Sequence, residues 1–355
     1  MKSLRESTPR AGWLAVAIVL VAFATGKVQA KEWQAWVGTQ SPDLGSQALA
    51  FLPNELWIHS NDSIRWTIAS TEIHTVTFLI PPPQPPPPGQ LGQVRNPLFG
   101  PVFGVQVGCP GATPDGASFD GSQCVNSGVM GTFDAIVGPR TYSVKFPKPG
   151  NFKFVCFVHF DMTGTVHVLD PSQGLPYDQD FYNREAQTDA ASLVSEATSL
   201  ASRGVREDND GGPAVKVTAG VGEIVTTSGA GSQTAALHRF VRDVVVIRVG
   251  DTVEWTNLDP STPHTVTFGA EPADPRSPSG NVTPTPDGAR QAVMSSPTDS
   301  ANSGLLTLAF QDRPNLGQSP LGVTRFRVTF KSPGTFNYIC SLHDIVGMKG
   351  TVIVH

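Results

Sequence analysis

The chain has 355 residues, among them 35 Gly and 31 Pro, and only 15% of its residues are charged. This length exceeds one ordinary domain, and the many turn-forming residues favour short strands over helical bundles. The net charge of −5 without a basic stripe argues against nucleic acid as a partner, and the 39% hydrophobic content excludes wholesale disorder.

Residues 1–30 have the features of a signal peptide. The basic residues Lys2, Arg5 and Arg10 are followed by an apolar core over residues 12–24. Small residues then precede a cleavage point after Ala30. An uncleaved anchor is the less favoured alternative, because the apolar run is short for a membrane span. We therefore expect an exported protein, periplasmic or extracellular, without a membrane span after cleavage.

The rest of the chain repeats itself. Residues 56–79 and 245–268 both read as a strand, a turn, a strand with Trp and the pentapeptide HTVTF, and residues 141–168 match residues 324–354. The matched segments alternate apolar and polar residues around Pro-Gly turns, as half-buried strands do. The residues expected to point inward are Tyr142, Val144, Phe146, Phe152, Phe154, Cys156, Phe326, Val328, Phe330, Phe336, Tyr338 and Cys340.

A different segment separates the two repeats. Residues 178–202 lack Gly and Pro and are rich in Ala, Glu, Gln and Leu, which predicts a helix. We therefore expect an all-β protein with a first domain over residues 31–170 and a second domain over residues 213–355. Residues 171–212 form a partly helical linker between them.

Each half offers the same four potential metal ligands in the same order. They are His74, Cys156, His159 and Met162 in the first half, and His264, Cys340, His343 and Met348 in the second. A thiolate and two imidazoles form a trigonal set that suits copper, with a thioether as a weak axial ligand, whereas structural zinc sites prefer closed sets of Cys and His. A lone buried Cys or Met is more often structural, but the repeated set predicts one copper ion in each half.

These motifs resemble two cupredoxins in tandem, the family of plastocyanin, pseudoazurin and amicyanin. The first ligand loop is similar to that of amicyanin, and the longer second loop to that of pseudoazurin or plastocyanin. The resemblance implies two Greek-key β-sandwiches, two type 1 (blue) copper ions per chain and electron exchange with redox partner proteins. It also implies that His159 and His343 reach the surface through apolar patches. Cupredoxins often place Asn after the first His ligand, where this chain has Thr75 and Thr265.

The main alternative is a two-domain copper enzyme, such as a nitrite reductase or a small multicopper oxidase. Such enzymes bind further copper through additional histidines and connect it through a His beside the ligand Cys. Here the neighbours of Cys156 and Cys340 are Val155, Phe157, Ile339 and Ser341, and no His-x-His motif occurs. We therefore favour an electron carrier over an enzyme, and a non-redox copper-binding module is a further alternative. The remaining histidines are interpreted as structural or incidental: His59, His167, His238 and His355.

Cys109 and Cys124 are the other two cysteines, and they enclose a short loop. In an exported protein this spacing favours a disulfide, with a free pair as the alternative.

Overall fold

The computed structural model describes residues 29–78, 112–133, 136–159, 161–203, 214–227, 231–307 and 323–355. Residues 1–28 of the expected signal peptide, and Cys109, lie outside these ranges. The described strands of the first half are β1 (Glu32–Gln40), β2 (Ser46–Leu52), β3 (Glu55–His59), β4 (Ser63–Ile68), β5 (Thr77–Phe78), β6 (Ala117–Ser118), β7 (Val125–Asn126), β8 (Thr132–Phe133), β9 (Ile136–Val137), β10 (Thr141–Lys145), β11 (Gly150–Val155) and β12 (Thr163–Leu169).

The helix α1 (Gln179–Ser199) follows β12 and precedes the second half. The described strands of that half are β13 (Val215–Thr227), β14 (Gly231–Val241), β15 (Val244–Ile247), β16 (Thr252–Leu258), β17 (Thr267–Phe268), β18 (Thr283–Pro284), β19 (Arg290–Met294), β20 (Ala301–Asn302), β21 (Arg325–Phe330), β22 (Gly334–Ile339) and β23 (Lys349–Val354). A 3₁₀ turn, Asp344–Val346, lies between β22 and β23. The all-β class and the helix between two β-rich regions, both predicted from the sequence, are confirmed.

Alternation along the strands builds the two cores. In β4 the side chains of Ile64, Trp66 and Ile68 are buried, while the residues between them are half-buried. The Trp66 ring contacts the rings of Phe78 and Phe154, and in the second half Trp255 contacts the corresponding residues, Phe268 and Tyr338. The inward-facing residues predicted from the sequence are buried, except for the half-buried Phe152.

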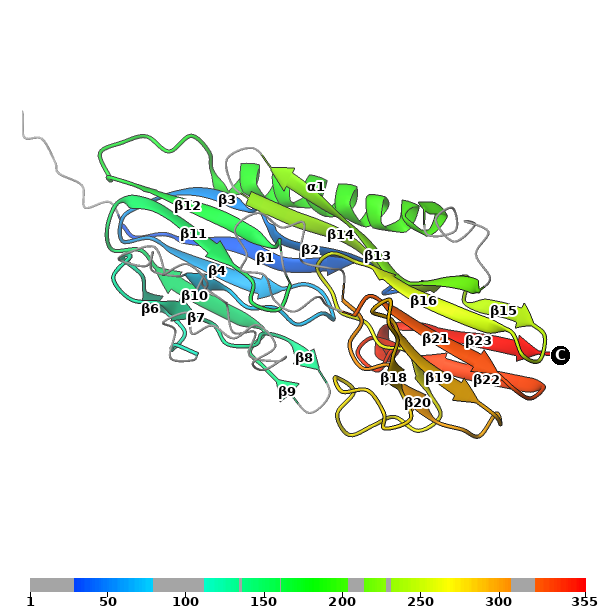
Figure 1. Cartoon of the computed structure of the whole chain (residues 1–355). Coiled ribbons are helices and arrows are strands. Elements are labelled where there is room, and N and C mark those ends of the chain that lie inside the picture. The colour runs from blue at the N-terminus through cyan, green and yellow to red at the C-terminus, as the bar shows by residue number, and fades with distance from the viewer. Residues whose placement is uncertain are drawn as a thin grey trace, which may run out of the picture.

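Each half has a five-stranded sheet of its own, in the order β3-β12-β11-β5-β7 in the first half and β15-β23-β22-β17-β20 in the second. The opposing sheet is shared. It has eleven strands in the order β18-β19-β21-β16-β13-β14-β2-β1-β4-β10-β6 and runs through both halves (Figure 1).

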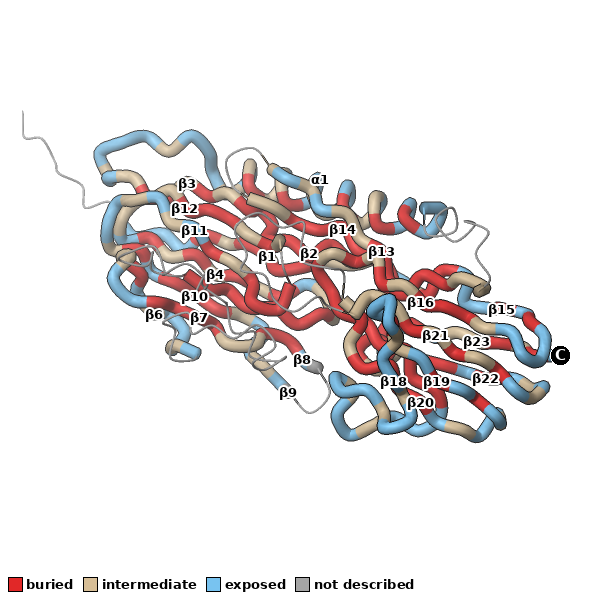
Figure 2. The backbone as a smooth tube through the Cα atoms, viewed as in Figure 1, coloured by how far each residue is buried: buried red, intermediate tan, exposed pale blue. Residues whose placement is uncertain are grey.

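The two halves meet where β2 pairs with β14 in antiparallel register, with Ala48 opposite Ala235. Every residue of β2 is buried, and Figure 2 shows this junction as a buried band that is continuous with both cores. The sequence repeat predicts two sandwiches but not this pairing, which joins them into one sheet.

The helix α1 covers the junction. It begins after Asp178, whose carboxylate accepts a hydrogen bond of 2.8 Å from the backbone N–H of Phe181, as an N-cap does. Its buried residues Ala186, Leu193 and Ala197 form a hydrophobic cluster with Ala48 of β2 and Ala235 of β14, among others. Within the described ranges, no helix is both long enough and apolar enough to span a lipid bilayer.

Candidate metal centres

The first histidine of each set is fixed by its own backbone. The N–H and C=O of His74 exchange hydrogen bonds of 3.1 and 2.8 Å with Met130, and those of His264 exchange bonds of 3.0 and 2.7 Å with Leu306. Both histidines come shortly before a short inner strand, β5 or β17. Their positions therefore correspond in the two halves.

The other ligand candidates lie in a loop that follows β11 or β22. The backbone N–H of Cys156 donates to the carbonyl oxygen of Met162 at 2.9 Å, and that of Cys340 donates to Met348 at 3.0 Å. These bonds close each loop between its Cys and its Met. Both methionine side chains are fully buried in the cores of their halves.

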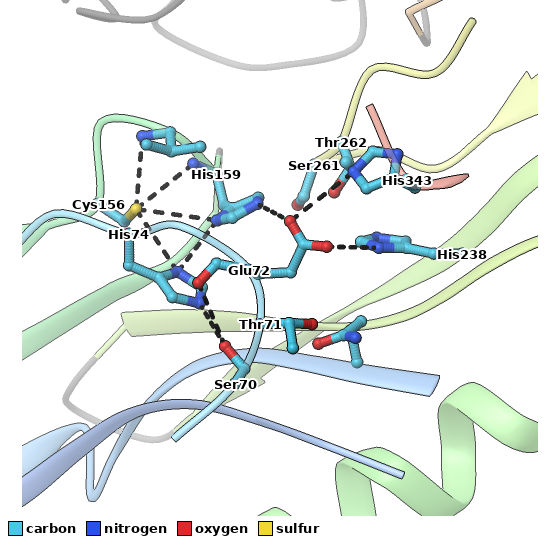
Figure 3. Close-up of polar contacts among 12 residues, drawn as sticks. Ser70, Thr71, Glu72, His74, Cys156, His159, His238, Ser261, Thr262 and His343 are labelled. Carbon is cyan, nitrogen blue, oxygen red and sulfur yellow. Dashed lines mark hydrogen bonds and ion pairs between the residues drawn. The ribbon is translucent and has the colours of Figure 1, made fainter. Parts of the chain in front are cut away.

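In both halves the histidines turn the same ring atom, Nδ1, toward the cysteine. In the first half the Cys156 Sγ atom lies 3.9 Å from Nδ1 of His74 and 3.9 Å from Nδ1 of His159, and the two nitrogens are 3.1 Å apart (Figure 3). The sulfur and the two nitrogens thus form a compact, buried triangle.

The second half repeats this triangle. The Cys340 Sγ atom lies 3.9 Å from Nδ1 of His264 and 3.3 Å from Nδ1 of His343, and these nitrogens are again 3.1 Å apart. In each half the three ligand atoms lie within 4.8 Å of one another. We refer to the triangles of the first and second halves as centre one and centre two.

The surroundings of both ligand cysteines favour the thiolate over the neutral thiol. Burial by itself raises the pKa of Cys156, but hydrogen bonds from His159 and His74 outweigh it and hold this pKa well below its ordinary value. For Cys340 the charge of His343 and the hydrogen bond from His264 likewise outweigh burial and lower the pKa well below its ordinary value. The thiolate is the form of cysteine that binds metals.

Thr75 and Thr265 connect the two ligand loops of each centre. The backbone N–H of each threonine donates to the ligand sulfur at 3.3 Å. Its hydroxyl oxygen accepts a 2.8 Å hydrogen bond from the backbone N–H of the residue after the cysteine, Phe157 or Ser341. In this chain threonine therefore ties the loops together at the position where cupredoxins often have Asn.

The donor set of each centre fits copper. One thiolate and two imidazoles form a trigonal set, and a methionine follows in the same closed loop, whereas a zinc site would call for a fourth strong ligand. Two glycines leave room for the rings. Gly38 and Gly220 lie at β-bulges of β1 and β13 with φ of +67° and +80°, and a Cβ atom on either would run into the ring of His74 or His264.

The substitution Gly220→Ala should therefore damage centre two. The added methyl displaces the His264 ring, and we expect copper to bind at this centre about ten- to a hundredfold more weakly, as for the loss of a residue that orients a ligand. Copper titration of the variant, followed by its visible absorption, measures this.

Gly250→Ala is the matched control, because Gly250 also has a positive φ, +99°, but nothing lies within 4 Å of the place that its added methyl would occupy. Its copper binding should stay unchanged. Equal binding by the Gly220→Ala variant and the unsubstituted protein would contradict a steric role for Gly220.

The structure adds three residues that sequence reasoning missed: Glu72, His238 and Asp259. Glu72 lies between the two centres, with its Oε2 atom 3.8 Å from Nε2 of His159 and 3.7 Å from Nε2 of His343 (Figure 3). Its Oε1 atom lies 3.2 Å from Nδ1 of His238. The Oδ2 atom of Asp259 is 3.5 Å from Nε2 of both His238 and His264.

These contacts bear on two expectations. The sequence favours a structural or incidental role for His238, and this residue is fully buried between the two centres, in contact with Glu72 and Asp259. The family resemblance implies that His159 and His343 reach the surface through apolar patches, yet they are only 2% and 4% exposed. The reason is that the β2–β14 pairing turns the ligand ends of the two halves toward each other. Glu72, His159 and His343 line a cavity of about 660 Å³ at this junction.

At the junction, burial and the neighbouring charges shift the pKa values in opposite directions. Burial raises the pKa of Glu72, but the charges of His343 and His238 and the close contact with His159 outweigh it, so this pKa lies well below its ordinary value. Burial lowers the pKa of His343, but the charges of Glu72 and Cys340 raise it to about 10. Glu72 is therefore a buried carboxylate anion surrounded by imidazoles.

The remaining candidates lie away from the centres. Nε2 of His59 contacts the carbonyl oxygen of Gln173, and His167 contacts Glu55 and stacks on Trp57. Cys156 and Cys340 are free thiols, whereas Cys124 is disulfide-bonded. Its expected partner, Cys109, lies outside the described residues, so that pairing stays a prediction.

Comparison with known proteins gives one family match. Residues 227–355 match the family model of copper binding proteins of the plastocyanin/azurin family. A solved structure of a Cu(I) amicyanin mutant aligns with 17% identity over 42% of this chain and 88% of that one, with a TM-score of 0.22. Oxidised plastocyanin from Dryopteris crassirhizoma aligns with 22% identity over 39% and 99% of the two chains, with a TM-score of 0.20. No curated protein matches the chain. The region 227–355, which holds the second ligand set, is therefore similar to the copper-binding proteins of the plastocyanin/azurin family.

Proposed function

We propose that this protein is an exported carrier of single electrons that holds one type 1 copper ion in each half. The observation that carries the proposal is the buried triangle of one Sγ and two Nδ1 atoms, built twice from corresponding elements. Bound copper supplies reversible one-electron exchange between Cu(I) and Cu(II). The protein contributes a site whose backbone bonds already fix the ligands, so little rearrangement accompanies the exchange.

The proposed ligands are four in each half. They are His74, Cys156, His159 and Met162 at centre one, and His264, Cys340, His343 and Met348 at centre two. The family match covers centre two. For centre one the support is the repeated geometry, including the equivalent threonine contact to the ligand sulfur.

Redox proteins outside the cytoplasm are the proposed donor and acceptor. Export is supported by the signal-like residues 1–30 and by the disulfide at Cys124. Ile345, which is 63% exposed, lines the same cavity as His159 and His343. A partner that docks over Ile345 would therefore approach both centres.

Copper quantitation of the purified mature protein, together with visible and EPR spectra, tests the proposal. We expect about two copper ions per chain and an intense colour from thiolate-to-copper charge transfer in the oxidised form, because each half has its own thiolate. A colourless copper complex, or stoichiometric zinc after native purification, would contradict it.

A two-domain copper oxidoreductase is the second candidate. It is favoured by the cavity that reaches both histidines and by the further cluster of Glu72, His238 and His343, whose ligand atoms also lie within 4.8 Å of one another. The same EPR experiment separates the two candidates. A third copper signal without thiolate character, with steady turnover of nitrite or oxygen, would favour the enzyme.

A further inference from the structure

Glu72 faces one histidine of each centre with a single oxygen atom. Its Oε2 lies 3.8 Å from Nε2 of His159 and 3.7 Å from Nε2 of His343, and the carboxylate is only 7% exposed. These two histidines belong to different halves of the chain. One buried anion is therefore shared between two sets of metal ligands (Figure 3).

The orientation of the two rings determines which nitrogen atom faces Glu72. Both rings turn Nδ1 toward their own cysteine, so the atom that faces Glu72 is the opposite nitrogen, Nε2. An imidazole that gives its Nδ1 lone pair to a metal carries its hydrogen on Nε2. A carboxylate beside Nε2 attracts that hydrogen, favours the metal-binding tautomer and orients the ring, here through ion-pair contacts of 3.8 and 3.7 Å.

The two halves contribute unequally to this arrangement. Two residues before the first ligand, the first half has Glu72, whereas the second half has Thr262. Conversely, His238 lies on β14, whereas β2, its pairing partner at the junction, contains no histidine. Centre two therefore has no glutamate of its own at this position, and His343 faces the carboxylate of the other half.

His238 and Asp259 connect Glu72 to His264, the other histidine of centre two. His238 approaches Oε1 of Glu72 with Nδ1 at 3.2 Å and Oδ2 of Asp259 with Nε2 at 3.5 Å. The same Oδ2 lies 3.5 Å from Nε2 of His264, and the other oxygen of Asp259 accepts hydrogen bonds from the backbone N–H groups of Ser261 and Thr262. Glu72 is thus hydrogen-bonded to a fully buried histidine, whose other ring nitrogen faces a fixed carboxylate.

From this geometry we infer that Glu72 is a positioning residue for both centres, and that metal binding at one centre raises the metal affinity of the other. The inference rests on the proposed pair of metal centres. A metal on His159 or His343 fixes that ring and its N–H toward Glu72, which in turn fixes the carboxylate for the second ring. Such a coupling is reciprocal: each centre favours the other by the same factor.

Cobalt(II) titration tests the positioning role without any redox step. The variants Cys340→Ser and Cys156→Ser each keep one complete thiolate centre, whose thiolate-to-cobalt absorption reports binding. In both backgrounds we expect Glu72→Gln to weaken cobalt binding by about ten- to a hundredfold, because an amide does not attract the two N–H groups as an anion does. Glu72→Asp, which keeps the charge but is too short to reach both rings, should also weaken binding and serves if the Gln variant does not fold.

Glu271→Gln is the matched control, because Glu271 is an exposed carboxylate that lines the same cavity. It should leave both affinities unchanged. The coupling is measured in the chain with both thiols, which should fill at cobalt concentrations about fivefold or more below those of the single-thiol variants. Glu72→Gln should remove this difference.

Three results would overturn the inference. The first is an effect of Glu72→Gln on centre one alone, which is what a purely local structural role would give. The second is unchanged binding at both centres. The third is a cobalt ion that persists when both cysteines are replaced and disappears with Glu72→Gln, because Glu72 would then be a ligand itself. Absence of thiolate absorption in the unsubstituted protein would instead overturn the proposed pair of centres.

Discussion

Replacement of Cys156 by serine should remove the charge-transfer absorption of centre one and leave about one copper ion per chain. The reason is that each triangle contains a single sulfur atom, and a serine hydroxyl stays protonated and binds soft metals poorly. The loss should be complete rather than partial, because Cys156 is the only cysteine among the ligand atoms of centre one. Copper quantitation and the visible spectrum of the variant measure both quantities.

Cys340→Ser is the reciprocal variant and the control. It should remove the absorption of centre two, and the two difference spectra should add up to the spectrum of the unsubstituted protein. Each variant should stay folded, since a serine is close to cysteine in size. Loss of both absorptions after either single substitution would show that the halves share their thiolates and would contradict two separate centres.

The residues of the ligand triangles could be predicted from the sequence because they belong to short motifs that occur twice in the chain. HTVTF occurs twice, and each occurrence is followed by a strand that ends at a cysteine with a histidine three residues later. Alternation of apolar residues places Cys156 and Cys340 on the inward face, where the structure has them. The role of Thr75 and Thr265 could not be predicted in this way, since it depends on how two distant loops approach each other.

The contacts at the junction could not be predicted, because they do not follow the sequence repeat. Glu72, His238 and Asp259 are far apart in the chain, and no motif connects them. They meet only because β2 pairs with β14, and that pairing depends on two strands rich in small residues, such as Ala48 and Ala235, that lie side by side. The presence of Glu72 two residues before a ligand is the one signal in the sequence, and it has no counterpart in the second half.

The pairing also changes how the two halves are related. Two sandwiches joined only by a linker would leave His159 and His343 near solvent, as the family resemblance implies. The shared eleven-stranded sheet instead turns these histidines toward a common carboxylate. The geometry of both centres is therefore tied to the stability of the junction, which α1 covers.

Leu193→Ala should test that dependence, with a decrease of about 2–5 kcal/mol in the free energy of unfolding. Leu193 is 3% exposed and packs in a cluster with residues of β2 and β14, so its loss leaves a cavity beneath α1 where the two halves meet. Because the sheet is continuous across the junction, both halves should unfold in one transition at a lower urea concentration. Circular dichroism follows the fold, and the absorption of each centre, measured in the single-thiol variants, follows its half.

Gln187→Ala, on the exposed side of the same helix, is the control and should change the free energy of unfolding by less than about 0.5 kcal/mol. Two separate transitions, of which Leu193→Ala shifts only one, would show that the halves are independent and that α1 stabilises one of them alone.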